Sequence, residues 1–265
     1  MIIANFIIPQ EQQQWLQLFK QILIPLSKLG ILLFVCYKIY SVIKAYRSAV
    51  DITLSSFLKL KTAVIEVFPN RFGEILSLEI GVIYFLFKKK RAHNYIKNEF
   101  SYHGNQGITT TIAALAFIIL LETVVVHWLI HDWNPLIAYL SSYSSLYLII
   151  LLISILRSRS HFPITIDYNN STLRLQYGFT NQSTINIKDI ESIEKSYKSN
   201  ITGFMKLSNF NEFESHNLIL HFTEPQVLQK AYGIKKCYTS IGIYVDNPEV
   251  LLQELLQFQN RESKI

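Results

Sequence analysis

Two apolar stretches joined by four residues constrain the fold of this chain more than any other feature. Residues 108–130, ITTTIAALAFIILLETVVVHWLI, and 135–156, PLIAYLSSYSSLYLIILLISIL, are each long enough to cross the ~30 Å core of a bilayer. The link between them, HDWN, is so short that the two stretches must run antiparallel. Trp128 and Trp133 lie at this end, as aromatic residues do at membrane interfaces. The sequence therefore predicts a transmembrane hairpin.

Basic residues give the expected orientation of the hairpin. The run KKKR at 88–91 precedes it, and Arg157 and Arg159 follow it. Cytoplasmic flanks collect Lys and Arg, so we expect HDWN outside and everything after Arg157 in the cytoplasm, in a multi-pass protein of the cytoplasmic (inner) membrane. The net charge is +6, but the basic runs flank apolar segments and do not alternate with aromatic and polar residues. We therefore expect no nucleic-acid partner.

The first hundred residues leave the number of spans open. Residues 22–43 predict one further span, although two lysines interrupt it, and residues 50–68 have the spacing of an amphipathic helix. Residues 72–87, FGEILSLEIGVIYFLF, are short for a span and contain two glutamates. If they lie against the cytoplasmic face, the chain has three spans and an outside amino terminus. If they cross, it has four spans and both termini inside. The basic residues between 44 and 71 favour three.

The pattern changes after Phe162 to the period-two alternation of β-strands. ITIDY and TLRLQY flank an Asn-rich turn and predict a β-hairpin, and STINI, ESIEK, NLILHF and KKCYTSIGIYV predict further strands. The motif DNPE then predicts the start of a closing amphipathic helix, 248–259. The expected fold class is α+β, with a membrane-embedded and membrane-associated helical region at 1–157. A small β-rich cytoplasmic domain with a C-terminal helix follows at 158–265.

Three sequence motifs of this domain resemble those of a known family. FPITIDYNNSTLRLQYGF, INIKDIESIEK and IGIYVDNPEVLLQEL resemble bacterial pleckstrin-homology-like domains, in which a late strand runs into a closing helix through a D-N/D-P-E turn. Together with FSYHGNQG and ETVVVHWLI, they make roughly residues 70–260 similar to a group of uncharacterised bacterial integral membrane proteins. The resemblance implies a pleckstrin-homology-like (PH-like) tail, and it implies no activity.

Several polar residues lie in or beside the apolar segments. Glu122 lies near the middle of its span, where a charge is costly, so we expect it to face the hairpin interior in protonated form. It would act there in proton or ion handling, or as a structural group bonded to the hydroxyls of SSYSSLY. His127, Glu79 and His103 are the other candidates for an intramembrane polar site.

Nothing in the sequence predicts a cofactor. His127 and His131 are four residues apart and share a helix face, but two histidines are only a weak indication of a metal site. We therefore expect no metal. The sequence has no P-loop, GxGxxG, GxSxG or HExxH word, which makes an enzyme less favoured without excluding one.

Two functions remain open from the sequence. The first is a membrane-anchored scaffold or sensor whose cytoplasmic domain binds a partner protein, peptide or lipid headgroup. Lys230, Lys235 and Lys236, around the connection AYGI, are its candidate contacts with anionic lipid. The alternative is a membrane enzyme or transporter that handles a lipid or apolar small molecule at a polar site around Glu122 and His127.

Overall fold

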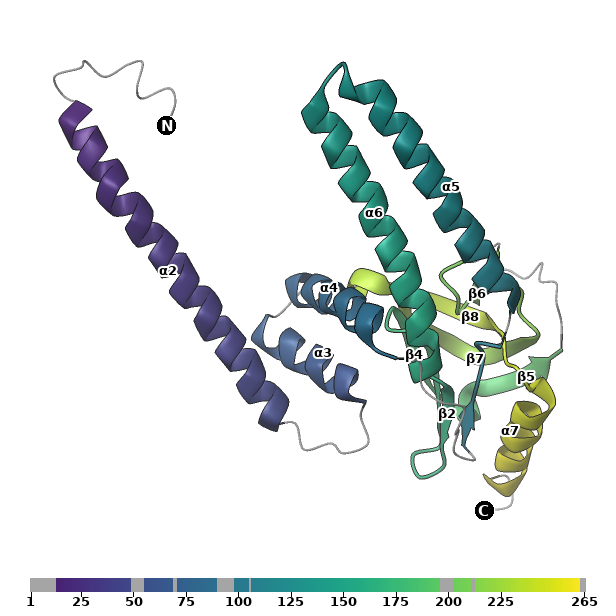
Figure 1. The fold of residues 1–265 in the computed structure, drawn as a ribbon. Coiled ribbons are helices and arrows are strands. Elements are labelled where there is room, and N and C mark those ends of the chain that lie inside the picture. Colours follow the sequence, from purple (N-terminus) through teal and green to yellow (C-terminus); the bar gives the residue numbers. More distant parts are fainter. Residues whose placement is uncertain are drawn as a thin grey trace. The chain divides into compact units, whose positions relative to one another are not determined.

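The structure is a computed structural model that describes residues 13–48, 55–68, 71–89, 98–104, 106–195, 203–210 and 213–262. The chain is mixed α+β, as predicted, with apolar helices first, then an eight-stranded sheet and a C-terminal helix (Figure 1). It divides into two compact units, Met1–Gly73 and Glu74–Ile265.

The first unit contains the helices α2, Gln13–Ser48, and α3, Ser56–Val67. The apolar side chains of α2 from residue 22 onward are mostly exposed, so this helix needs an apolar environment to cover it. The short helix α3 begins where the Ser55 hydroxyl accepts a hydrogen bond from the backbone N–H of Leu58. The Lys38 ammonium group does not lie free but donates to the carbonyl of Val67, at the carboxyl end of α3. The amphipathic helix is confirmed from Ser56, while residues 50–54 of that prediction lie outside the described residues.

The second unit begins within the first turn of α4 (Arg71–Phe87) and continues with α5 (Gln106–His131) and α6 (Pro135–Ser158). The chain reverses between α5 and α6 because the Asn134 side chain accepts from the N–H groups of Leu136 and Ile137, and Pro135 supplies the first helical residue. The predicted hairpin is therefore confirmed as two antiparallel helices.

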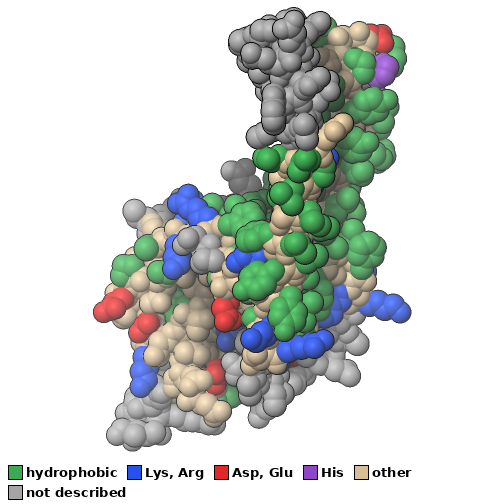
Figure 2. All heavy atoms as spheres, turned by 90° about the vertical axis from the view of Figure 1, so that its left-hand side faces the viewer, with side chains coloured by type: hydrophobic (Ala, Val, Ile, Leu, Met, Phe, Trp, Pro, Cys, Tyr) green, Lys and Arg blue, Asp and Glu red, His purple; other side chains and the backbone are tan. Residues whose placement is uncertain are grey.

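Among the described residues, three helical segments are long and apolar enough to cross a membrane: Gln21–Ser48, Gly107–His131 and Pro135–His161. Helix α4 has 17 residues and is shorter. Figure 2 shows one face of the molecule, on which hydrophobic side chains gather over helices and most Lys, Arg, Asp and Glu side chains lie apart from them. The helices therefore agree with the three-span alternative.

The sheet has the order β1-β2-β3-β4-β7-β8-β6, and β5 pairs with β7. Its pairs are antiparallel except for the parallel pair of β6 and β8. The long strand β7 is irregular between His221 and Gln226, and it pairs with β5 before this point and touches β4 at its end. The strands are β1 (Glu99–Phe100), β2 (Ile164–Asp167), β3 (Thr172–Tyr177), β4 (Asn181–Asn186), β5 (Ile190–Glu194), β6 (Phe204–Lys206), β7 (Leu218–Gln229) and β8 (Lys235–Ile243).

The predicted strands are confirmed, and two short ones were missed. Strand β1 lies before the helical hairpin, and β6 lies in a polar stretch where no alternation marks a strand. Both strands lie at the ends of the sheet. There, backbone pairing with the one neighbouring strand determines whether a strand forms, and the side-chain pattern predicts little. The closing helix α7, Pro248–Glu262, begins where the sequence predicts it.

The helical hairpin and the sheet share packed residues. Ile108 and Ile112 of α5 are buried against Leu152 of α6, and Phe210 from the β6–β7 connection packs on the same cluster. Strand β1 also joins the segment before α5 to the sheet. Position 157/158 therefore lies inside one compact unit, Glu74–Ile265, and the division into a membrane region at 1–157 and a cytoplasmic domain at 158–265 stays a prediction.

Candidate functional site

A buried ion pair lies where the chain leaves α6 and enters the sheet. Arg159 follows α6 directly, in the 3-10 turn η2 (Arg159–His161), and Glu214 lies between β6 and β7. The two residues are 2% and 3% exposed, and a guanidinium nitrogen lies 2.8 Å from Glu214 Oε1. Because charges are costly to bury, such a pair persists only when its other bonding groups are also satisfied.

Neighbouring polar groups bond to both members of this pair, in which only the buried Arg159 Nε is left without a hydrogen-bond partner among the described residues. The hydroxyl of Tyr177 donates to Glu214 Oε2 at 2.6 Å, and that of Ser208 donates to the same oxygen. Arg159 donates to the backbone carbonyl of Tyr102 at 2.8 Å, and its guanidinium lies 5.4 Å from the Tyr102 ring centroid and 5.2 Å from that of Tyr177. We name these five residues, Tyr102, Arg159, Tyr177, Ser208 and Glu214, the buried cluster.

Four segments that are far apart in the sequence supply the buried cluster: the residues before α5, the end of α6, the end of β3 and the β6–β7 connection. The Tyr102 hydroxyl also accepts the N–H of Gly178 at 2.8 Å. Gly178 has φ +53, and a Cβ at this position would collide with the Ser158 hydroxyl. Glycine at 178 therefore allows the β3–β4 turn to approach the end of α6.

The electrostatics of the buried cluster favour a structural role. Burial, together with the Glu214 carboxylate, raises the pKa of Tyr177, so this hydroxyl stays protonated and remains a donor. The carboxylate accepts from Arg159, Tyr177 and Ser208, and is therefore poorly placed to serve as a general base.

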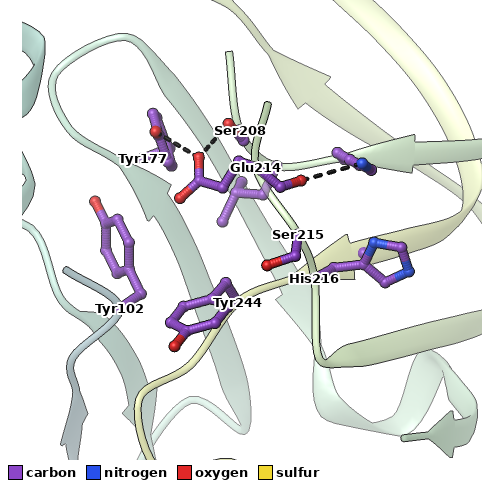
Figure 3. A pocket seen from close by; sticks show the side chains of 10 residues that line it. Tyr102, Tyr177, Ser208, Glu214, Ser215, His216 and Tyr244 are labelled. Atoms are coloured by element: carbon purple, nitrogen blue, oxygen red, sulfur yellow. Dashed lines mark hydrogen bonds between the residues drawn. The ribbon is translucent and has the colours of Figure 1, made fainter. Parts of the chain in front are cut away.

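A small cavity of about 10 Å³ lies beside the buried cluster, which is room for roughly one water molecule. Figure 3 shows the hydroxyls of Tyr177 and Ser208 directed at Glu214, with the His216 ring on the opposite side from Tyr102 and Tyr177. His216 is buried, and neither of its ring nitrogens has a hydrogen-bond partner among the described residues. Burial, followed by the charge of Lys206, lowers the pKa of His216, so the ring is neutral at neutral pH. The cavity is too small for an organic substrate.

The expectation that Glu122 faces the hairpin interior is wrong for this pair of helices. Glu122 is exposed on α5. His127, which does contact α6, lies about 140° away around the helix axis, because five residues separate the two positions. The carboxylate therefore lies outside the stripe of α5 that packs on α6.

His127 is held by α6. Its Nδ1 lies 2.8 Å from the hydroxyl oxygen of Ser142, and that hydroxyl also contacts the carbonyl of Ala138 at 2.9 Å. The His131 ring centroid is 5.6 Å from that of His127. The two imidazoles line an open groove of about 460 Å³ at the HDWN end of the hairpin. Within the described ranges, no group of three or more His, Cys, Asp or Glu side chains is placed to hold a metal ion.

Glu79 and His103 lie elsewhere. Both carboxylate oxygens of Glu79 are 2.8 Å from the Tyr147 hydroxyl, which donates to this carboxylate. His103 precedes α5, roughly 30 Å along the helix from His127. Asp246, which lies between β8 and α7, accepts hydrogen bonds from the Ser101 hydroxyl and the Gly104 N–H of the loop that contains His103.

The structure therefore does not gather the predicted intramembrane residues into one site. His127 contacts Ser142 and Glu79 contacts Tyr147. These two α6 residues are five apart and so face directions about 140° apart. The convergence that an enzyme or transporter around Glu122 and His127 requires is not observed.

The three lysines do lie together. Lys230, Lys235 and Lys236 flank the connection between β7 and β8, which contains the 3-10 turn η4, Ala231–Gly233. Lys235 and Lys236 are exposed and Lys230 is half-buried. Burial, followed by the charge of Lys236, lowers the pKa of Lys230.

Sequence reasoning missed the buried cluster. Arg159 reads as one of several basic residues after a span, and Glu214 lies in a polar stretch without periodicity. The two positions are 55 residues apart, and nothing local connects them. The one available signal was the arginine placed three residues before the apolar strand FPITI.

Comparison of the chain with models of protein families, with curated proteins and with solved structures found no match.

Proposed function

We propose that this protein is a membrane-anchored scaffold or sensor. In this proposal, the apolar helices anchor the chain in the cytoplasmic membrane. The β-rich region binds a partner protein, peptide or lipid headgroup at the cytoplasmic face. We also propose that this region has a pleckstrin-homology-like fold, supported by the strand pair around the Asn-rich turn and by the closing helix α7.

The observation that carries the proposal is the ion pair of Arg159 and Glu214. It joins the end of α6 to the segment between β6 and β7, and both side chains are fully buried. A buried pair must keep its geometry to remain bonded, so it fixes the β-rich region against the end of the helical hairpin. A scaffold needs such a fixed surface beside the membrane, and a sensor needs such a connection between a binding surface and its helices.

The orientation gives the first prediction. A reporter enzyme fused after Ile265 is expected to be active only if the reporter works in the cytoplasm, because KKKR, Arg157 and Arg159 flank the hairpin on the same side as the β-rich region. Paired fusions with a cytoplasmic and an exported reporter measure this. Activity of the exported reporter at this position would reverse the proposed orientation.

Binding is tested with the intact protein purified in mild detergent, with bound lipids and proteins both identified. We expect a bound molecule in fixed ratio to the wild-type chain. It should be retained equally by Glu122→Gln and His127→Ala, because these positions lie on the helical hairpin away from the β-rich region. Glu214→Leu should release it, because that change disrupts the buried cluster.

Two results would contradict the proposal. One is the absence of any bound molecule from repeated preparations. The other is a molecule lost from Glu122→Gln or His127→Ala while the β-rich region stays folded, because the binding site would then lie between the helices.

A further inference from the structure

The connection between β7 and β8 carries an unusual exposed surface. We name residues Lys230–Lys236 the β7–β8 tip. Its two large apolar side chains, Tyr232 and Ile234, are both exposed, and Lys235 and Lys236 follow them directly. Tyr232 has φ +61, a backbone conformation that bulky residues rarely adopt. The chain therefore keeps an aromatic side chain that is 43% exposed at a strained backbone position.

The β7–β8 tip rests on the beginning of α4. The side-chain amide of Gln229, the last residue of β7, donates to Glu74 Oε1 at 2.9 Å. Gly233 lies directly against the same glutamate, since a Cβ at this position would be 2.8 Å from Glu74 Cγ. Figure 1 shows the connection beside α4 and above the lower end of α6.

Helix α4 in turn lies along the last turns of α6. The Ser154 hydroxyl donates to the carbonyl of Val82 at 2.8 Å, and Tyr147 contacts Glu79. Tyr232 of the tip lies near Tyr147 of α6. From Tyr147 to the end of α6 the helix rises roughly 16 Å, about half of the ~30 Å bilayer core. These contacts place the tip beside the half of α6 that leads into the β-rich region.

We propose that the β7–β8 tip inserts into the cytoplasmic leaflet of the bilayer, with Tyr232 and Ile234 in the interfacial region and Lys235 and Lys236 on anionic lipid headgroups. This deepens the function proposed above and rests on it for the choice of leaflet. Exposed Ile75 and Ile83 of α4 extend the apolar surface between α6 and the tip.

Two features favour a lipid surface over a protein partner. The tip rests on α4, and α4 contacts α6, a membrane span whose own apolar side chains are exposed and need lipid around them. Its order, an aromatic and an aliphatic side chain followed by two lysines, also matches the interface, where aromatic rings sit at headgroup level and lysines reach anionic phosphates.

The depth of the tip is measured by spin labelling of the full chain in lipid nanodiscs that contain anionic lipid. In a background of Cys36→Ser and Cys237→Ser, a single label is placed by Tyr232→Cys or, as the control, by Tyr168→Cys. The two tyrosines are 43% and 40% exposed, and Tyr168 lies at the turn between β2 and β3. We expect the label at 232 to collide mainly with oxygen, which partitions into lipid, and the label at 168 mainly with a water-soluble nickel reagent.

Two outcomes would overturn the insertion. Equal access of the nickel reagent to both labels would place the tip in water. Protection of the label at 232 from both reagents would mean that protein covers the tip.

The headgroup contact is tested by counting the phosphatidylglycerol and phosphatidylcholine molecules retained per chain after a mild detergent wash. The double variant Lys235→Gln and Lys236→Gln is expected to lose at least half of the wild-type preference for phosphatidylglycerol. The matched variant Lys188→Gln and Lys195→Gln, which removes the same charge elsewhere in the β-rich region, should keep it. Equal preferences in the two variants would contradict the headgroup contact.

Failure of the insertion and failure of the proposed function give different results. If the label at 232 lies in lipid while an exported reporter after Ile265 is active, the tip still inserts, but the proposed orientation is wrong. If the label lies in water while the cytoplasmic reporter is active and a partner is bound, the proposed function stands and the insertion is wrong.

Discussion

Replacing Glu214 with leucine is expected to destabilise the β-rich region by about 3–5 kcal/mol. The change leaves the Arg159 guanidinium buried without its 2.8 Å carboxylate partner, and it leaves the Tyr177 hydroxyl without its acceptor. Hydrogen exchange of the full chain in nanodiscs measures this. Protection of the amides of β3 and β7 should fall roughly 10²- to 10⁴-fold, because these strands open with the whole region.

Two further variants separate the charge from the packing. Glu214→Gln keeps the side-chain volume and a hydrogen-bond acceptor. It should therefore lower the stability of the β-rich region less than Glu214→Leu does, but more than a substitution on the surface. The double variant Arg159→Met and Glu214→Leu leaves no buried charge and should be more stable than Glu214→Leu alone. If Glu214→Leu lowers protection by less than tenfold, Arg159 is solvated and the buried cluster does not hold the region together.

Replacing Leu255 with alanine is expected to lower the free energy of unfolding by about 2–5 kcal/mol. Leu255 lies on α7 with no exposed surface, and Leu251, four residues earlier on the same face, is equally buried. Truncation leaves a cavity where α7 packs on the β-rich region. Urea unfolding of the purified full chain in detergent, followed by far-ultraviolet circular dichroism of its strands, measures the free energy of unfolding.

The neighbouring residue provides the control. Leu256 is 45% exposed on the same helix, so Leu256→Ala removes the same atoms, keeps the helix propensity and should change stability by no more than about 0.5 kcal/mol. Equal losses in the two variants would mean that α7 does not pack with Leu255 inward.

Hydrophobic pattern alone was enough to predict most elements of this chain. Residues 108–130 and 135–156 became α5 and α6 because stretches that are apolar all round and about this long have few alternatives to membrane-crossing helices. Strands β2 and β3 and helix α7 formed where alternation, an Asn-rich turn and the DNPE word predicted them. These signals are local, so the sequence contains them in full.

The side-chain environments required the tertiary structure. The low polarity of the surrounding residues suggested that Glu122 faces inward, but the direction of a side chain depends on which stripe of α5 packs on α6, and Glu122 lies outside it. Both helices are apolar on every side, so their sequences carry no amphipathic pattern that selects the packed stripe.

The sequence by itself determined the helical hairpin, the β-rich region after Phe162 and the lysines around AYGI. Only the tertiary structure decided that Arg159 meets Glu214, and that the β7–β8 tip rests on α4 beside α6. The physical reason is the distance along the sequence over which each kind of interaction acts. Helix and strand patterns repeat every few residues, whereas a buried ion pair joins positions 55 residues apart whose meeting depends on how the sheet, α4 and the helical hairpin pack together.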